Sequence, residues 1–147
     1  MRYRLLFAVC VGAICLGWLS HTDRDVLVAQ APKPIMMTRI YTGADGLSHA
    51  EEIPLKLTGT GVSETFKATS AQFSRRPPGP RSDWHVGPRR QFVITLSGRA
   101  ELEVAGGKKV PVEAGHITLI EDTTGKGHIT QNVGSDDRIV VTIPLGE

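Results

Sequence analysis

Apolar and polar residues alternate with a period of two over several short segments in the second half of the chain. Successive side chains of a β-strand point to opposite faces, so this alternation predicts strands that each bury one face. The segments are Gln91–Ser97, Ala100–Ala105, Lys108–Val112, Ile117–Ile120, His128–Val133 and Arg138–Ile143. No segment shows a convincing period of 3.6 residues. The pattern therefore predicts an all-β sandwich or barrel.

Glycine and proline mark the ends of these segments. Gly98 indicates a turn or a point of close packing, and the pair at 106–107 predicts a hairpin. A further strand is predicted over Ser63–Phe73, before a proline-rich loop at 75–80 that no central strand could include. Residues 32–57 show turn chemistry but no firm pattern. We treat them as an N-terminal arm before a barrel domain at 58–147.

The beginning of the chain is typical of a signal peptide, which we place at residues 1–31. A basic start is followed by the uncharged run Leu5–Leu19, and Ala29–Ala31 fits a small-x-small cleavage site. The apolar run is shorter than the roughly 20 residues of a membrane span. We therefore expect an exported protein, periplasmic or extracellular, that contacts a membrane only if this segment is not cleaved.

Composition excludes several classes of function. Both cysteines, Cys10 and Cys15, lie in the predicted signal peptide, so the mature chain has no thiol nucleophile and no disulfide. The formal net charge is +2, and near-neutral charge argues against a nucleic-acid partner. No nucleophile-elbow motif is present, which disfavours a serine hydrolase. The 147 residues suffice for one compact domain with a core.

Two histidines and a glutamine are the main candidates for chemistry. His85 and Gln91 are separated by an even number of residues, so on a regular strand they point the same way, and His128 lies in a second extended segment. If the strand is already regular at Arg89, just after Pro88, this arginine shares the face of Gln91, where its guanidinium could clamp a carboxylate. The alternative is that both histidines are satisfied by hydrogen bonds in a polar pocket. Likewise, the arginine could belong to a solvated strand edge.

The segment around these residues resembles the two motifs of the cupin superfamily, G-x5-HxH-x3-4-E-x6-G and G-x5-PxG-x2-H-x3-N. The matching positions are Gly79, His85, Gly98, Gly107, Gly115, His128 and Asn132. The resemblance covers about half of the chain. It implies a double-stranded β-helix, that is, a jelly-roll barrel, and it raises homodimer formation as an open alternative.

The chain departs from the family pattern in the gap between Gly115 and His128, which is longer than the motif allows, and above all in the metal site. Gly87 stands where a metal-binding cupin has its second histidine, and Gln91 stands where it has a glutamate. The remaining candidate ligands, His85, Gln91 and His128, are all neutral, so a divalent ion such as Fe, Zn, Mn, Ni or Cu would be held weakly. Glu121 or Asp122 could supply negative charge, although the pattern does not say which of them faces inward.

Two functions remain open. In the first, the domain binds a small anionic organic molecule through Arg89, Gln91, His85 and His128. In the second, it is a metal-dependent cupin enzyme, a dioxygenase, isomerase or decarboxylase that acts on a small organic acid, with the two histidines and the glutamine as ligands. No catalytic residue is assigned. The missing ligand at position 87 favours the first function.

Overall fold

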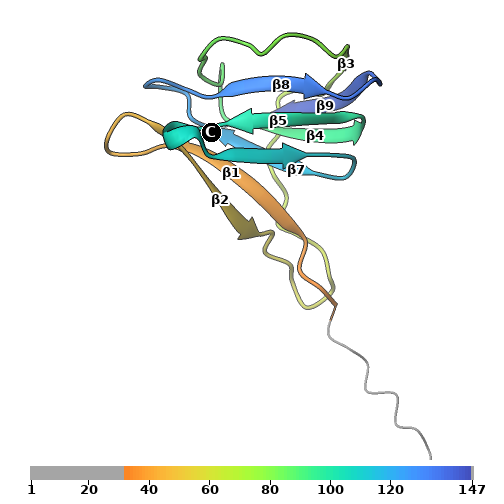
Figure 1. Cartoon of the computed structure of the whole chain (residues 1–147). Helices are drawn as coiled ribbons and strands as arrows, with labels where there is room; N and C mark the ends of the chain where they lie inside the picture. Colours follow the sequence, from red (N-terminus) through yellow and green to blue (C-terminus); the bar gives the residue numbers. More distant parts are fainter. Residues whose placement is uncertain (1–31, 147) are drawn as a thin grey trace, which may run out of the picture. The chain divides into compact units, whose positions relative to one another are not determined.

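The computed structural model describes residues 32–146, so the predicted signal peptide lies outside the described residues. Within this range the fold is all-β, as predicted, with nine strands in two sheets (Figure 1). The strands are β1 (Met36–Thr42), β2 (Ser48–Pro54), β3 (Gln72–Arg76), β4 (Gln91–Ser97), β5 (Arg99–Glu103), β6 (Lys109–Val112), β7 (Ile117–Glu121), β8 (Ile129–Val133) and β9 (Arg138–Pro144). Residues 32–146 contain no helix that is long and apolar enough to cross a membrane.

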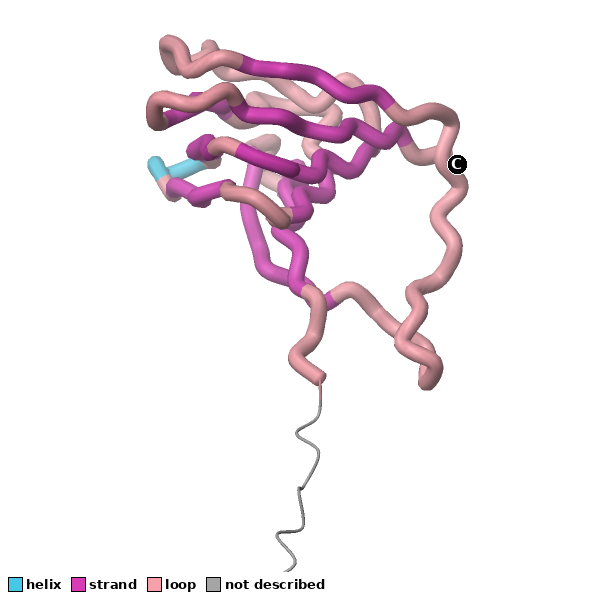
Figure 2. Tube along the Cα trace, turned by 90° about the vertical axis from the view of Figure 1, so that its right-hand side faces the viewer, coloured by secondary structure: helices cyan, strands magenta, loops and turns pink. Residues whose placement is uncertain are grey.

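The larger sheet has six strands in the order β2-β1-β7-β4-β9-β3, and the smaller sheet has the order β6-β5-β8. Strand β4 is central and pairs antiparallel with both β7 and β9. Strand β1 pairs parallel with β7, and the hairpin of β1 and β2 thereby joins the larger sheet. The segment treated as an N-terminal arm thus supplies two strands of this sheet. Loops of varying length connect the strand layers (Figure 2).

Apolar side chains form one cluster on each side of the larger sheet. The first lies between the two sheets and combines residues of both: Ile40, Ala100, Leu102, Val104, Val110, Val112 and Ile120. The second, around Met37, Phe92 and Leu119, lies on the opposite face. There the ring of Phe66 packs edge-on against Phe92, with centroids 4.9 Å apart. The larger sheet is therefore covered on both faces.

The prediction of a strand over Ser63–Phe73 is wrong for most of its length. Residues 64–71 form no strand, and the regular strand here is β3, which begins only at Gln72. Phe66 explains the difference, because its side chain anchors an irregular segment on the sheet instead of alternating within one. The strand predicted over Gln91–Ser97 has the bounds of β4.

Gly98 is a point of close packing, as the sequence indicated. Its φ is +73°, and a Cβ built on it would lie 2.6 Å from the Cα of Arg138. No other residue type tolerates this backbone conformation together with so close a neighbour. The glycine thus lets the beginning of β9 pack against the turn between β4 and β5.

Candidate functional site

A cavity of about 410 Å³ lies between the two sheets. This volume is within the range of small-molecule sites in proteins. Its lining comes from both sheets and from the loop that precedes β4. The polar residues are Ser70, Gln72, Arg76, His85, Arg89, Gln91, Thr118, His128, Thr130, Arg138 and Thr142, and the apolar ones are Val93, Leu102, Ile120, Pro88 and Pro144, with Gly87. All four residues that the sequence predicted to bind a ligand are among them.

His85 and His128 are brought together by a pair of backbone hydrogen bonds. Each amide donates to the carbonyl of the other residue, at 2.9 and 2.8 Å, and the ring centroids lie 4.6 Å apart. Gly127 permits this approach, since its φ is +78° and a Cβ there would lie 2.0 Å from the carbonyl oxygen of His85. The structure therefore shows the meeting of two distant histidines that the sequence suggested.

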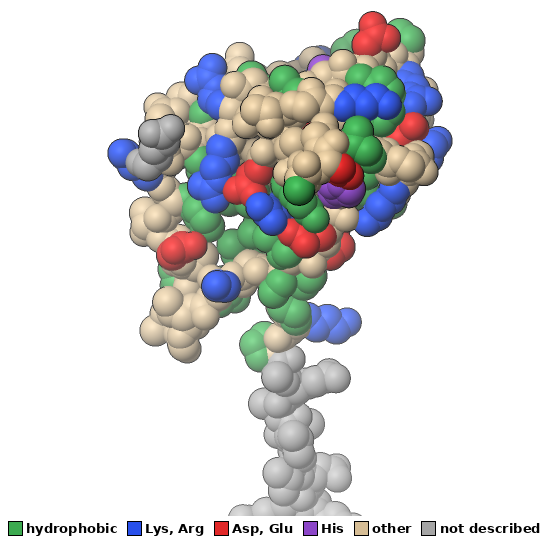
Figure 3. Space-filling view, turned by 90° about the vertical axis from the view of Figure 1, so that its left-hand side faces the viewer, with side chains coloured by type: hydrophobic (Ala, Val, Ile, Leu, Met, Phe, Trp, Pro, Cys, Tyr) green, Lys and Arg blue, Asp and Glu red, His purple; other side chains and the backbone are tan. Residues whose placement is uncertain are grey.

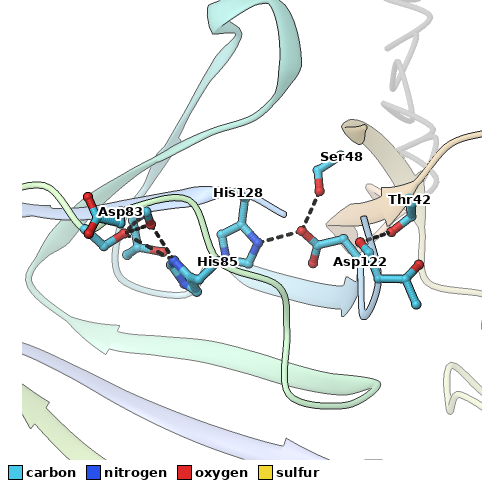
Figure 4. Close-up of polar contacts among 9 residues, drawn as sticks. Thr42, Ser48, Asp83, His85, Asp122 and His128 are labelled. Carbon is cyan, nitrogen blue, oxygen red and sulfur yellow. Dashed lines mark hydrogen bonds and ion pairs between the residues drawn. The ribbon is translucent and has the colours of Figure 1, made fainter. Parts of the chain in front are cut away.

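The Nδ1 atoms of both histidines are engaged, as Figure 4 shows. Nδ1 of His85 donates to the carbonyl oxygen of Asp83 at 2.9 Å, and Nδ1 of His128 donates to Oδ2 of Asp122 at 2.7 Å. A neutral imidazole that carries its proton on Nδ1 has its lone pair on Nε2. Each histidine thus keeps Nε2 as an acceptor or metal ligand.

Asp122 is the inward-facing carboxylate of the two that the sequence offered. It is 0% exposed, and Oδ2 also accepts a hydrogen bond of 2.7 Å from Ser48 on β2. Its Oδ1 is buried and has no hydrogen-bond partner among the described residues. Asp122 therefore fixes the orientation of His128, as acidic partners of ligating histidines commonly do.

Glu121 points to the opposite side of the sheet. It accepts hydrogen bonds from Arg39 at 2.5 Å and from Arg90 at 2.6 Å. Partial burial alone would raise the pKa of Glu121, but these two hydrogen bonds lower it below its ordinary value. Glu121 and Arg90 consequently stabilise the outer face and do not contribute to the cavity.

The structure also explains the missing histidine at position 87. A Cβ built on Gly87 would lie 2.3 Å from Cγ2 of Ile120, which belongs to the apolar cluster between the two sheets. The space that a side chain would need is therefore filled by an isoleucine. Gly87, which replaces the second histidine of the family motif, is thus accompanied by Ile120, 33 positions later, which fills the space. Substitution of Gly87 by histidine alone would therefore overlap Ile120 and would not restore the ligand.

The remaining donors do not fit a tightly held metal ion. They are two imidazoles and the amide of buried Gln91, and no group of three or more His, Cys, Asp or Glu residues suited to a metal occurs within residues 32–146. The cavity lining contains three arginines and no carboxylate. A divalent ion there would be uncompensated and repelled by cations, which is unfavourable in a partly buried site.

The arginines divide between the cavity and the surface. Arg89 lies in the turn before β4, where it lines the cavity and is also exposed to solvent. Arg75 lies on the surface and forms an ion pair with Asp137 at 3.2 Å. Arg76 and Arg138 line the cavity from β3 and β9. On the face shown in Figure 3, by contrast, Lys and Arg side chains are interspersed with Asp and Glu. The positive charge of the cavity is therefore a local feature.

Sequence reasoning did not identify Arg138 as a site residue. The signal was present, because the predicted strand over Arg138–Ile143 puts this arginine in phase with Val140, which is buried in the structure. The roles of His85, Gln91, His128 and Arg89 in ligand binding stay predictions, although the structure gathers all four around one cavity.

Comparisons with known proteins agree with this fold. The sequence profile of the cupin domain matches residues 72–144. No curated protein matches the chain. Among solved structures, a cupin-like protein from Thermotoga maritima shares 18% identity, with coverage of 69% of this chain and 73% of its own, at a TM-score of 0.43.

Two further structures are similar to this chain. An uncharacterised conserved protein from Klebsiella pneumoniae with a double-stranded β-helix domain is 25% identical over 58% of this chain and 80% of its own, with a TM-score of 0.41. A predicted oxalate decarboxylase from Thermotoga maritima is 20% identical over 76% of this chain and 94% of its own, with a TM-score of 0.41. With the profile match, the two-sheet barrel and the paired histidines of its motifs, the chain belongs to the cupin superfamily.

Proposed function

We propose that this domain binds a small organic anion in the cavity between its sheets. The observation that carries the proposal is the composition of the lining, which includes three arginines but no carboxylate. A partly buried cavity with this excess of cationic donors favours a negatively charged occupant, because charge-assisted hydrogen bonds are the strongest that such groups make.

The histidine end of the cavity supplies the polar contacts of the proposed ligand. Nε2 of His85 and of His128 can accept hydrogen bonds, and the side chain of Gln91 can both donate and accept. Arg89 is exposed at the same end, where it can pair with an anionic group at the mouth. A ligand with a hydroxyl or amine near this end would satisfy the acceptors.

The test is a titration monitored by NMR of the histidine rings. Benzoate, hexanoate and phenylacetate would each be compared with the amide of the same acid, which matches its shape without its charge. We expect the acids to shift the signals of His85 and His128 and the amides to have much weaker effects. Equal effects of acid and amide, or no response to any acid, would contradict anion binding.

The second candidate is a metal-dependent enzyme that acts on a small organic acid. The observation in its favour is that both Nδ1 atoms are engaged, so both Nε2 atoms are oriented as metal ligands commonly are. Elemental analysis of the protein, purified without chelator or metal-affinity resin, tests it beside His85→Ala. Near-stoichiometric metal that disappears in the variant would support the enzyme, and metal-free wild-type protein would support the binding module.

We also propose that the protein is exported. The support is the charge and hydropathy pattern of residues 1–31, which resembles a cleaved signal peptide. N-terminal sequencing of the protein recovered from the extracytoplasmic fraction would test this, with a start near Pro32 as the expected result. Recovery of the intact chain from the cytoplasm would contradict it. Homodimer formation stays a prediction from the family resemblance.

A further inference from the structure

We propose that Arg138, together with Arg76, forms a carboxylate-binding subsite at the end of the cavity away from the histidine pair. The inference rests on the proposed function and deepens it, because it assigns the position of the anionic group and the shape of the ligand. It differs from the sequence-based expectation, in which Arg89 at the mouth would hold the anion.

Arg138 is a buried cation without an acidic partner. The residue is 2% exposed and lines the cavity, and its Nε and Nη2 donate to Oγ1 of Thr95 at 3.2 and 2.8 Å. No ion pair links it to any Asp or Glu within residues 32–146. Burial of an unpaired charge is strongly unfavourable, and such groups in proteins usually face a counter-ion or a ligand.

Arg76 adds to this imbalance. It is the direct antiparallel partner of Arg138 in the pairing of β3 with β9, so both side chains lie on the same face and both line the cavity. Like charges directly opposite each other destabilise a sheet. Burial and, to a smaller extent, the charge of Arg76 together lower the pKa of Arg138 to about 10. An anion between the two guanidinium groups would relieve the repulsion.

The acidic residues at this end of the barrel are engaged elsewhere. Glu52 and Glu113 act on His116, whose pKa is lowered by burial despite them, and Arg138 also lowers it. Glu52 accepts a hydrogen bond from Thr38, and Thr38 also contacts Nε2 of His116 at 3.0 Å. Neither glutamate forms an ion pair with Arg138 in the described chain.

A buried hydroxyl adds a further donor to the cavity. Oγ1 of Thr118 lines the cavity and has no hydrogen-bond partner among the described residues. Buried hydroxyls are rarely left unpaired, and an unpaired one facing a cavity indicates a group that binds there. The planar fork of a guanidinium and a hydroxyl together suit a carboxylate, which accepts several hydrogen bonds.

The spacing along β4 defines the length of the ligand. The guanidinium of Arg138 lies at Thr95, four residues along the strand from Gln91, which corresponds to about 13 Å. Gln91 lies opposite Ile120, and Ile120 contacts the loop of His85 at Gly87. A ligand that reaches both ends is therefore an elongated acid, with the carboxylate on Arg138 and a polar group near the histidines.

The experiment measures the binding of hexanoate by calorimetry, with hexanamide as the uncharged counterpart. The variants are Arg138→Met, which keeps an unbranched apolar stem but removes the guanidinium, and Arg76→Gln. The matched control is Arg75→Gln on the same strand, whose side chain points to the surface. We expect Arg138→Met to raise the Kd for hexanoate by at least about tenfold, Arg76→Gln to raise it less, and Arg75→Gln to leave it unchanged.

A second measurement covers the case in which Arg138→Met does not fold. The Nε–H signal of Arg138 in the wild-type protein should shift on addition of hexanoate but not of sodium chloride at equal ionic strength. Unchanged binding in Arg138→Met, or an unshifted Arg138 signal at saturation, would overturn the subsite. If the affinity is instead lost in Arg89→Gln, anion binding stands and only the subsite is wrong. If neither hexanoate, benzoate nor phenylacetate binds the wild-type protein, both proposals fall.

Discussion

Substitution of Gly127 by alanine should disrupt the histidine pair. The backbone of Gly127 has a φ of +78°, and its missing side chain makes room for the carbonyl of His85, 2.0 Å from where a Cβ would lie. This neighbour is backbone, so it cannot rotate away. The loop of His85 would have to move, and with it the two backbone hydrogen bonds to His128.

The expected loss of stability has two parts. A left-handed backbone costs a residue other than glycine about 1–2 kcal/mol. The two backbone hydrogen bonds contribute about 0.5–1.5 kcal/mol each, so their loss adds about 2 kcal/mol. We therefore expect Gly127→Ala to lower the free energy of unfolding by about 3–4 kcal/mol. Gly106→Ala is the matched control, because Gly106 has a φ of +72° but, apart from its chain neighbours, no residue within 4 Å of its Cβ position.

Equilibrium unfolding in urea measures both variants. Gly106→Ala should lose only the backbone contribution, so the two variants should differ by about 2 kcal/mol. The NMR signals of the His85 and His128 rings should also shift in Gly127→Ala and remain unchanged in Gly106→Ala. Equal unfolding free energies in the two variants would refute the argument that the close approach of His85 to Gly127 holds the site together.

Three further predictions concern the surroundings of the site. Gly87→Ala should lower the free energy of unfolding, because the new methyl group would overlap Ile120. In the double variant with Ile120→Ala, the loss of unfolding free energy in urea should be smaller than the sum of the two single losses by about 1 kcal/mol. Strict additivity would contradict the contact. The pKa of Glu121 is lowered from its ordinary value of 4.5, so ionised Glu121 stabilises the fold at any pH above 4.5. This stabilisation is lost as the pH falls through the lowered pKa. Glu121→Gln should therefore flatten the acid side of the pH–stability curve, whereas a curve parallel to that of the wild type would be inconsistent with the ion pairs. Gln91→Glu should raise the affinity for divalent metal, measured by calorimetry with Zn²⁺ and Mn²⁺, more than Gln72→Glu, which adds the same charge on β3; equal gains would argue against Gln91 as a ligand.

The alternation of residues predicted the second half of the fold well. In β5, β6 and the first half of β9, buried residues alternate with more exposed ones, which is the condition under which a period of two is visible. The hairpin of β1 and β2 was missed for the opposite reason. Met37, Thr38 and Ile40 of β1 are all buried, because the larger sheet is covered on both faces, so the pattern does not alternate.

The site could be predicted only as far as local spacing determines it. His85, Gln91 and His128 stand in recognisable motifs, and the structure gathers them at one cavity. The choice between Glu121 and Asp122 depended on where β7 ends, and burial of Asp122 follows from its contact with Ser48, 74 residues earlier. The filling of position 87 by Ile120 likewise depends on packing between separate strands, which spacing along the chain does not encode.

The parallel pairing of β1 with β7 has a consequence for the order in which the domain folds. Arg39 of β1 and Glu121 of β7 are 82 residues apart, so a chain that emerges with its N-terminus first presents the hairpin long before its partner strand. An isolated hairpin is marginally stable in that interval, and its charged residues, among them Arg39 and Glu51, guard against edge-to-edge aggregation. The cavity also needs Arg138 on β9. The binding site therefore cannot form until nearly the whole domain has emerged.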